Sequence, residues 1–196
     1  MRYFGRIPQL PSPETERLSL VIPTADMAAQ ALRFRQENRE HLAPWSPPTT
    51  PDFFTERYWA ARLRSAADEY RAQQAARFVL FLKGRQDGPI IGEMNFTSIV
   101  KGAFLACYLG YAIDAQYEGK GLMSEALRAG IVHVFEVLRL HRIMAHYMPT
   151  NVRSARLLRK LGFTVEGYAR DYLFLAGAWQ DHVLTSLTNP KSIEPD

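Results

Sequence analysis

The chain has 196 residues, a formal net charge of +4 and 47% hydrophobic residues, which suit one packed domain over residues 1–196 with its core at about 17–187 and short tails. No apolar run approaches the roughly 18 residues of a membrane helix, and the stretch after Met1 has no apolar signal region. With Cys107 as its only cysteine, the sequence excludes intrachain disulfides and cysteine zinc clusters, and it predicts a cytoplasmic protein.

Hydrophobic patterning predicts a strand followed by two helices in the first third of the chain. The strand covers residues 17–22 and the first helix covers 26–38. Residues 41–48 contain three prolines, so we expect a rigid loop that is neither helix nor strand. Asp52 is the expected N-cap of a second helix over residues 53–75.

The rest of the chain alternates between strands and helices. We expect strands at 78–83, 90–98, 104–114, 142–148, 172–175 and 182–187, and helices at 122–138 and 152–161. Gly162 is the expected C-terminal glycine of the second of these helices. Hairpins give antiparallel pairs and a crossover helix gives a parallel pair. The sequence therefore predicts an α/β (α+β) fold with a mixed, mostly antiparallel sheet flanked by helices.

Two residue types argue against metal or thiol chemistry. Cys107 lies in an apolar predicted strand, which favours a buried, inert thiol over a nucleophile. The five histidines have no metal-ligand spacing, so no metal is expected.

A turn with two glycines follows the strand at 104–114 and opens into the helix at 122–138. Its pattern is Gln116-x-x-Gly119-x-Gly121. Two glycines one residue apart let the backbone curl around an anion, and the helix N-terminus points at the same place. The pattern is not that of a P-loop. It also fails the dinucleotide fingerprint, because Ser124 stands where the third glycine would be. A diphosphate of some other cofactor is the anion that remains.

In context this turn resembles a known family. After one further strand it is followed by Asn151-x-x-Ser154 and then by Leu161-Gly162-Phe163, an order similar to that of the GCN5-related N-acetyltransferases (GNAT). The resemblance spans about residues 17–187. Within the family, the segments at 41–45, 106–111, 119–123, 141–145 and 181–185 resemble the RimJ-type ribosomal-protein-alanine N-acetyltransferases.

The resemblance implies the GNAT acyl-CoA N-acyltransferase fold, acetyl-CoA as co-substrate and a role for each motif residue. Gln116 belongs to the turn, and the backbone N–H groups from Gly119 to Met123 would hold the coenzyme A diphosphate. The strand from Leu109 to Ile113 would pair with the pantetheine arm, and the Ile113 N–H would polarise the thioester carbonyl. Asn151 would bind the pantetheine amide, and Ser154 would protonate the departing thiolate. The five diphosphate-binding residues are Gly119, Lys120, Gly121, Leu122 and Met123.

Several of these residues also have a structural interpretation. Asn151 precedes a predicted helix and is therefore equally a candidate N-cap. A hydroxyl at the position of Ser154, in the first turn of that helix, is often idle. The Lys120 side chain is more simply a solvated cation, because the turn needs only its backbone.

The sequence has no carboxylate at the usual position of the family's general base. Tyr108 stands where many relatives carry a carboxylate, and a tyrosine with an ordinary pKa near 10 is a poor base. An α-amine with a pKa of about 7.7–8.0 is partly neutral at pH 7, so the missing carboxylate favours an N-terminal amine over a lysine. Asp171 is the first candidate proton acceptor, ahead of Glu166, Glu93 and Asp181, and a surface or strand-pairing carboxylate is the alternative. Trp45 is a candidate wall of the acceptor groove or an ordinary core residue.

The resemblance implies transfer of acetyl to the N-terminal alanine of a small-subunit ribosomal protein, with the assembling small subunit as a possible partner. One alternative is a relative that acetylates a small amine or antibiotic. Another is a ribosome-associated assembly factor, although no RNA-binding module or basic stripe supports that as a sole function. Neither membrane nor DNA binding is expected.

Overall fold

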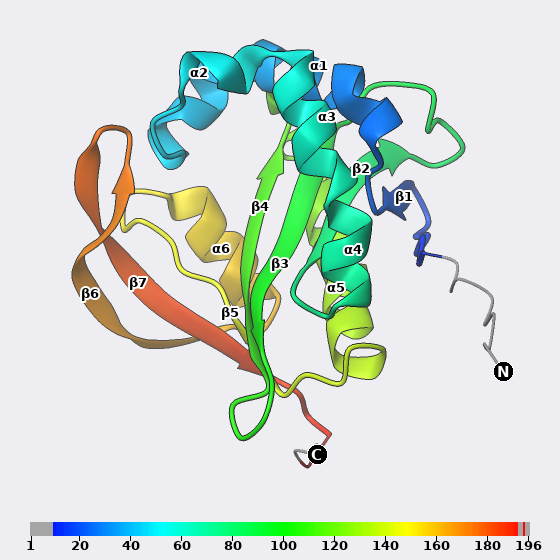
Figure 1. Cartoon of the computed structure of the whole chain (residues 1–196). Coiled ribbons are helices and arrows are strands. Elements are labelled where there is room, and N and C mark those ends of the chain that lie inside the picture. The colour runs from blue at the N-terminus through cyan, green and yellow to red at the C-terminus, as the bar shows by residue number, and fades with distance from the viewer. Residues whose placement is uncertain (1–9, 192–193, 195–196) are drawn as a thin grey trace, which may run out of the picture.

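A seven-stranded sheet forms the centre of the computed structural model, which describes residues 10–191 and 194 (Figure 1). The strand order is β1-β2-β3-β4-β5-β7-β6. Only β4 and β5 are parallel, which confirms the expected mixed, mostly antiparallel sheet. The strands are β1 (Leu18–Val21), β2 (Ala76–Leu82), β3 (Gly92–Val100), β4 (Ala106–Ile113), β5 (Arg142–Met144), β6 (Thr164–Leu175) and β7 (Ala178–Thr188).

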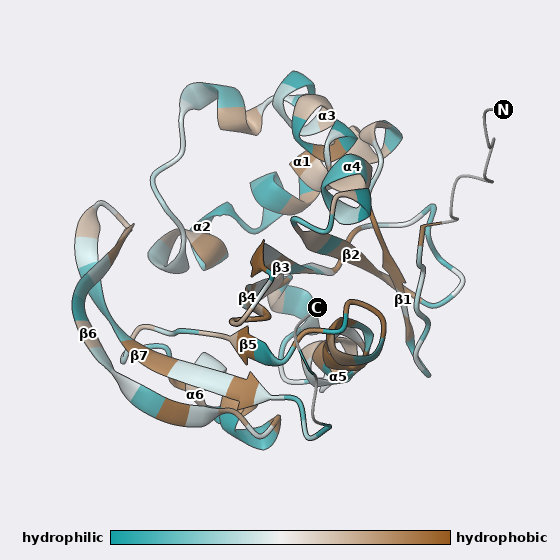
Figure 2. Cartoon of the chain, turned by 60° about the horizontal axis from the view of Figure 1, so that its bottom comes forward, coloured by the Kyte–Doolittle hydropathy of each residue, from teal (hydrophilic) through white to brown (hydrophobic). Residues whose placement is uncertain are grey.

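Helices cover both faces of the sheet. Figure 2 shows α1, α2 and α3 on one side and α5 and α6 on the other. The α-helices are α1 (Ala28–Glu37), α2 (Arg39–Leu42), α3 (Glu56–Arg64), α4 (Ala66–Arg71), α5 (Leu122–Glu136) and α6 (Val152–Lys160). The described residues also form four 3-10 turns: η1 (Ala25–Met27), η2 (Ala43–Trp45), η3 (Pro51–Phe54) and η4 (Ala115–Tyr117). None of the helices in the described part of the chain is long and apolar enough to cross a bilayer.

Each face of the sheet has its own hydrophobic cluster. Phe78 and Met94 belong to the cluster on the α5 side, and Phe34 and Trp59 belong to the cluster beneath α1 and α3. The helix α5 lies close to the sheet at Gly130, where a Cβ would stand 2.7 Å from the Met94 sulfur. The absence of a side chain at Gly130 therefore lets α5 pack this close to β3.

The predicted strands and the last two helices are confirmed, with shifted ends. Gly162 closes α6 in the left-handed conformation, with φ of 90°, as expected for a C-terminal glycine. Cys107 is fully buried, which confirms the expected buried thiol, and burial raises its pKa to about 12. Two strands near the C-terminus, β6 and β7, are longer than predicted, and β5 is shorter. The tails expected outside residues 17–187 lie only partly within the described residues.

Two predictions for residues 39–75 were wrong. The expected rigid loop contains α2 and η2, because Pro44 sits in the first turn of η2, where a missing N–H does no harm. The expected single helix after Asp52 is divided. Asp52 lies inside η3, and Thr55 caps α3 by accepting the Tyr58 N–H at 3.3 Å.

A gap opens between the two parallel strands at the middle of the sheet. The pairing of β4 with β5 ends at Tyr108 and Met144, whereas β4 stays paired with β3 as far as Ile113. Beyond Met144 the chain turns toward β7, with Ala145 N–H donating to Thr185. The segment 109–113 therefore has an edge without a neighbouring strand on the β5 side.

Candidate functional site

The glycine turn connects the end of β4 to α5 through two left-handed residues. Gly119 has φ of 71°, and Gly121, the N-cap of α5, has φ of 78°. A side chain at either position would be strained. A Cβ at Gly119 would meet no atom within 4 Å, so the space beside this backbone is open.

The backbone N–H groups from Gly119 to Ser124 donate to no described residue, whereas Tyr117, Glu118 and Glu125 all have backbone acceptors. Some of these free groups belong to the first turn of α5, where the helix dipole also favours an anion. Leu122, Met123 and Ser124 are buried, so their unpaired donors favour an anionic ligand. The turn therefore fits the diphosphate of coenzyme A.

A salt bridge from the N-terminal segment braces the turn. Arg17 pairs with Glu125 at 2.6 Å and also donates to the Lys120 carbonyl at 3.1 Å. Burial alone would raise the pKa of Glu125, but hydrogen bonds from Thr15 and Arg17 and the Arg17 charge lower it overall. The Lys120 side chain is exposed and stacks over the Tyr117 ring at 5.2 Å.

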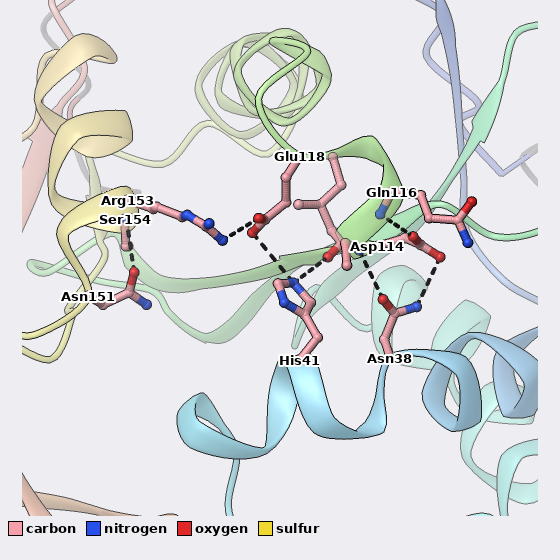
Figure 3. Close-up of polar contacts among 10 residues, drawn as sticks. Asn38, His41, Asp114, Gln116, Glu118, Asn151, Arg153 and Ser154 are labelled. Carbon is pink, nitrogen blue, oxygen red and sulfur yellow. Dashed lines mark hydrogen bonds and ion pairs between the residues drawn. The ribbon is translucent and has the colours of Figure 1, made fainter.

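A buried polar pair fixes the point where the turn leaves β4 (Figure 3). Asn38 donates to Asp114 at 3.0 Å and accepts the Ala115 N–H at 3.0 Å. The other oxygen of Asp114 accepts the Gln116 N–H at 2.7 Å. Both side chains are more than nine-tenths buried. The Gln116 backbone is thereby held, while its side chain is exposed.

His41 connects α2 to the same region. Its Nε2 lies 3.2 Å from the Ile113 carbonyl and 3.5 Å from Glu118 Oε1, and Glu118 also pairs with Arg153 of α6 (Figure 3). Helices α2 and α6 are thus both connected to the glycine turn.

The backbone N–H and C=O groups of β4 point alternately toward β3 and toward the unpaired edge. The Asp114 N–H donates to Ile91, on the β3 side, so the groups of the preceding residue, Ile113, face the other way. By alternation, Leu109 and Tyr111 also present their N–H and C=O groups to the gap. An extended ligand can therefore add to this edge as a strand.

Ser154 lies beside the gap and is held from two directions. Its backbone N–H donates to Asn151 Oδ1 at 3.1 Å, so Asn151 is the N-cap of α6. Its hydroxyl lies 2.7 Å from the Tyr111 hydroxyl of β4. Burial, opposed by the hydrogen bond to Ser154, raises the pKa of Tyr111 to about 12. Tyr111 thus stays protonated and is suited to donate to Ser154 Oγ.

Three of the four candidate carboxylates have fixed partners. Glu93 pairs with Arg35 at 2.5 Å, and Glu166 pairs with Arg142 at 2.6 Å. Asp181 accepts the Tyr168 hydroxyl at 2.6 Å and the Asp171 N–H at 2.9 Å. Asp171 itself is exposed, with φ of 48°, where the register of β6 shifts against β7. No described residue makes a hydrogen bond or ion pair with its carboxylate.

Aromatic side chains gather where β4 and β5 separate. The His146 ring lies 5.5 Å from the Tyr108 ring and 5.5 Å from the Tyr172 ring. Burial is the main cause of the lowered pKa of His146, and its Nδ1 accepts the Thr185 N–H at 3.2 Å. The neutral imidazole then carries its proton on Nε2, which makes it a donor and not a base.

A backbone hydrogen bond joins the segment after η2 to the tip of the β6–β7 hairpin. The Ala176 N–H at the hairpin tip donates to the carbonyl of Ser46 at 2.9 Å. The neighbouring Trp45 is about one-third exposed (38%), so it is not a core residue. Trp45 therefore stands at an exposed position next to the residue that contacts the hairpin tip.

Sequence reasoning missed three of the supporting residues, Arg17, Asn38 and Asp114, and it noted His41 and Tyr111 only within motifs. All five act through contacts between distant parts of the chain, which no local pattern reveals. Within the described residues no cluster of three His, Cys, Asp or Glu could hold a metal ion.

Comparisons with known proteins agree with this geometry. Residues 17–164 match the family model "Acetyltransferase (GNAT) domain". The chain is 44% identical over 176 residues to the [Ribosomal protein uS5]-alanine N-acetyltransferase of Escherichia coli, covering 90% of each.

Two solved structures are also similar. A ribosomal-protein-S5-alanine acetyltransferase from Vibrio fischeri superposes with a TM-score of 0.87 at 37% identity, covering 92% of this chain and 98% of that one. Mycobacterium smegmatis RimJ in complex with CoA-disulfide superposes with a TM-score of 0.81 at 31% identity, covering 89% of this chain and 85% of that one.

Proposed function

The chain belongs to the GNAT family of acetyl-CoA-dependent N-acetyltransferases, and we propose that it acetylates the N-terminal alanine of ribosomal protein uS5. The observation that carries the reaction is the row of unpaired N–H groups from Gly119 to Ser124 beside the open edge of β4. The proposed acceptor rests on the relatives that share the length of the chain.

The open edge suggests how acetyl-CoA lies in the site. With the diphosphate on residues 119–123, the pantetheine arm runs back along β4 toward Tyr108, where the gap closes. Leu109 is four residues from Ile113, roughly 13 Å along the strand. We therefore assign the thioester carbonyl to the Leu109 N–H, and the Ile113 N–H, predicted above for that role, to the pantetheine. Asn151 keeps its amide N–H₂ for the same arm while its oxygen caps α6.

The reaction needs three events at this place. The neutral amine attacks the thioester carbon, and a backbone N–H on β4 stabilises the oxyanion. The C–S bond then breaks, and the thiolate takes the proton of the Ser154 hydroxyl, which Tyr111 orients by donating to Ser154 Oγ. Where the amine arrives as the ammonium ion, it first loses a proton to Asp171, directly or through water. The second proton, which the attacking nitrogen loses after the attack, returns through water to Ser154.

Replacing Ser154 with Ala should lower kcat roughly tenfold, because a thiol pKa near 8.5 makes the thiolate a fair leaving group without help. Tyr111→Phe should lower kcat about threefold by releasing the Ser154 hydroxyl, and the double variant should be no slower than Ser154→Ala alone. Steady-state kinetics with acetyl-CoA would check both, with KM for acetyl-CoA little changed. If the loss of kcat in the double variant equalled the product of the two single losses, the two hydroxyls would act separately.

Asp171→Asn should slow the reaction most at low pH. An α-amine is roughly 10–20% neutral at pH 7 and about half neutral near pH 8, so the need for a proton acceptor shrinks as pH rises. We expect a loss of about tenfold in kcat/KM at pH 6.5 and about twofold at pH 8.5. The matched control is Asp68→Asn, an exposed carboxylate on α4. A pH-independent effect of Asp171→Asn would exclude the proposed role.

The function itself is tested by incubation with acetyl-CoA and three acceptors: a uS5 N-terminal peptide starting with alanine, the same peptide with a blocked N-terminus, and a panel of polyamines and aminoglycosides. We expect a mass increase of one acetyl group on the free peptide alone. Acetylation restricted to the small amines would replace the ribosomal acceptor by the alternative considered above.

Association with the assembling small subunit and a cytoplasmic location follow from the proposed acceptor. Both depend on uS5 being the substrate. Comparing the intact masses of ribosomal proteins from cells with and without the chain would test the acceptor in its own setting.

A further inference from the structure

A cavity of about 180 Å³ lies between α1, α3 and the strands β2 and β3, and the reaction described above does not use it. Its walls combine aromatic rings, including Phe53 and Trp59, with the guanidinium groups of Arg35, Arg62 and Arg77. The only carboxylate in its lining is Glu93. A partly exposed cavity with three arginines and one carboxylate favours an anionic group.

Arg35 and Glu93 neutralise each other. They pair at 2.5 Å, and the guanidinium also lies 5.1 Å from the Trp59 ring centre and 5.5 Å from that of Phe34. These contacts hold Arg35 in place through ionic and cation–π attraction. Glu93 is therefore not a free carboxylate for a basic ligand.

Arg62 and Arg77 share a single carboxylate. Arg62 lies 3.0 Å from one oxygen of Glu69, and Arg77 lies 2.7 Å from the other. Burial alone would raise the pKa of Glu69, but hydrogen bonding and the charges of Arg77 and Arg62 lower it overall. Two cations on one anion leave one positive charge uncompensated, and each guanidinium has further N–H donors for a ligand.

A row of residues across the sheet joins this cavity to the open edge of β4. In register, Arg77 of β2 stands beside Asn95 of β3, which stands beside Gly110 of β4. These residues share one face of the sheet, the face that α1 and α3 cover next to the cavity. A Cβ at Gly110 would meet no atom within 4 Å, so the space directly above this residue, beside Asn95, is open.

We propose that this cavity is a subsite for an acidic side chain at the third or fourth residue of the acceptor peptide. Neighbouring strands lie roughly 4.8 Å apart, so β2 is about 10 Å from β4 and about 14 Å from a thioester arm paired with β4. Three residues of extended peptide cover about 10 Å, and the long acidic and arginine side chains cover the rest. A peptide with its α-amine at the thioester therefore reaches Arg62 and Arg77 at these positions. The inference rests on the proposed function, since it requires a peptide acceptor.

The test uses alanine-starting hexapeptides with neutral residues elsewhere and a single Glu, Gln or Lys at position 2, 3, 4 or 5. For the unmodified protein, kcat/KM should be about tenfold higher with Glu than with Gln at position 3 or 4, and equal at position 2. Arg62→Gln and Arg77→Gln should each reduce that preference to about threefold or less. Glu69 keeps one arginine in either variant, so the helix α4 stays anchored.

The control variant is Arg64→Gln, which removes the same charge from an exposed position on α3 outside the cavity lining and should keep the full preference. Alaninamide, too short to reach the cavity, should react equally with all four proteins. If neither alaninamide nor any peptide is acetylated, the proposed function fails. If peptides react but Glu and Gln are equivalent, if Lys is preferred, or if both cavity variants keep the preference, the subsite is disproved.

Discussion

A variant with both Gly119→Ala and Gly121→Ala should fold and yet have a KM for acetyl-CoA raised roughly 100-fold. Each alanine would have to hold a left-handed φ, near 71° or 78°, at a strain of about 1 kcal/mol. The added Cβ at residue 119 would also stand in the open space beside the unpaired N–H groups. A loss of about 2.8 kcal/mol of binding corresponds to that 100-fold change.

The matched control is Gly84→Ala. Gly84 also has φ of 71° and open space around its Cβ position, but it lies in the turn after β2. The Gly84→Ala variant should lose about as much free energy of unfolding as each single glycine substitution in the double variant, and it should keep the normal KM for acetyl-CoA. If Gly84→Ala raised KM as much as the double variant, or if the double variant bound acetyl-CoA normally, the glycine turn would not be the diphosphate site.

Asp114→Ala should lower the free energy of unfolding by about 3 kcal/mol and the Tm by roughly 10 °C. The change removes the acceptor of two donors, the Asn38 amide and the Gln116 N–H, in a place that is more than nine-tenths buried. Urea denaturation would measure the free energy. Because the same contacts hold the start of the glycine turn, KM for acetyl-CoA should rise as well.

Asp68→Ala is the comparison for that variant. Asp68 pairs with Arg71 on the surface of α4, where the ion pair contributes little, so a change below about 0.5 kcal/mol is expected. Equal stability of the two variants would show that the Asn38–Asp114 pair does not anchor the turn.

The sequence determined those parts of the protein that depend on neighbouring residues. The order of strands and helices after Ala75, the glycine turn and the capping roles of Asn151 and Gly162 all follow from local patterns, and the structure confirms them. Local pattern failed around Pro44 and Asp52. There the sequence allowed several short helices or none, and packing against the cluster that contains Val79 and Phe81 of β2 decided between them.

Only the tertiary structure decided what surrounds the turn. The gap beside β4 exists because β5 stops pairing at Met144, and no residue pattern marks that point. The Tyr111–Ser154 contact joins residues 43 positions apart, and the Asn38–Asp114 contact joins residues 76 positions apart. A local pattern can predict a backbone that binds a diphosphate, because glycine adopts those dihedrals without strain. It cannot predict partners across the sheet, since their approach is set by the packing of the whole core.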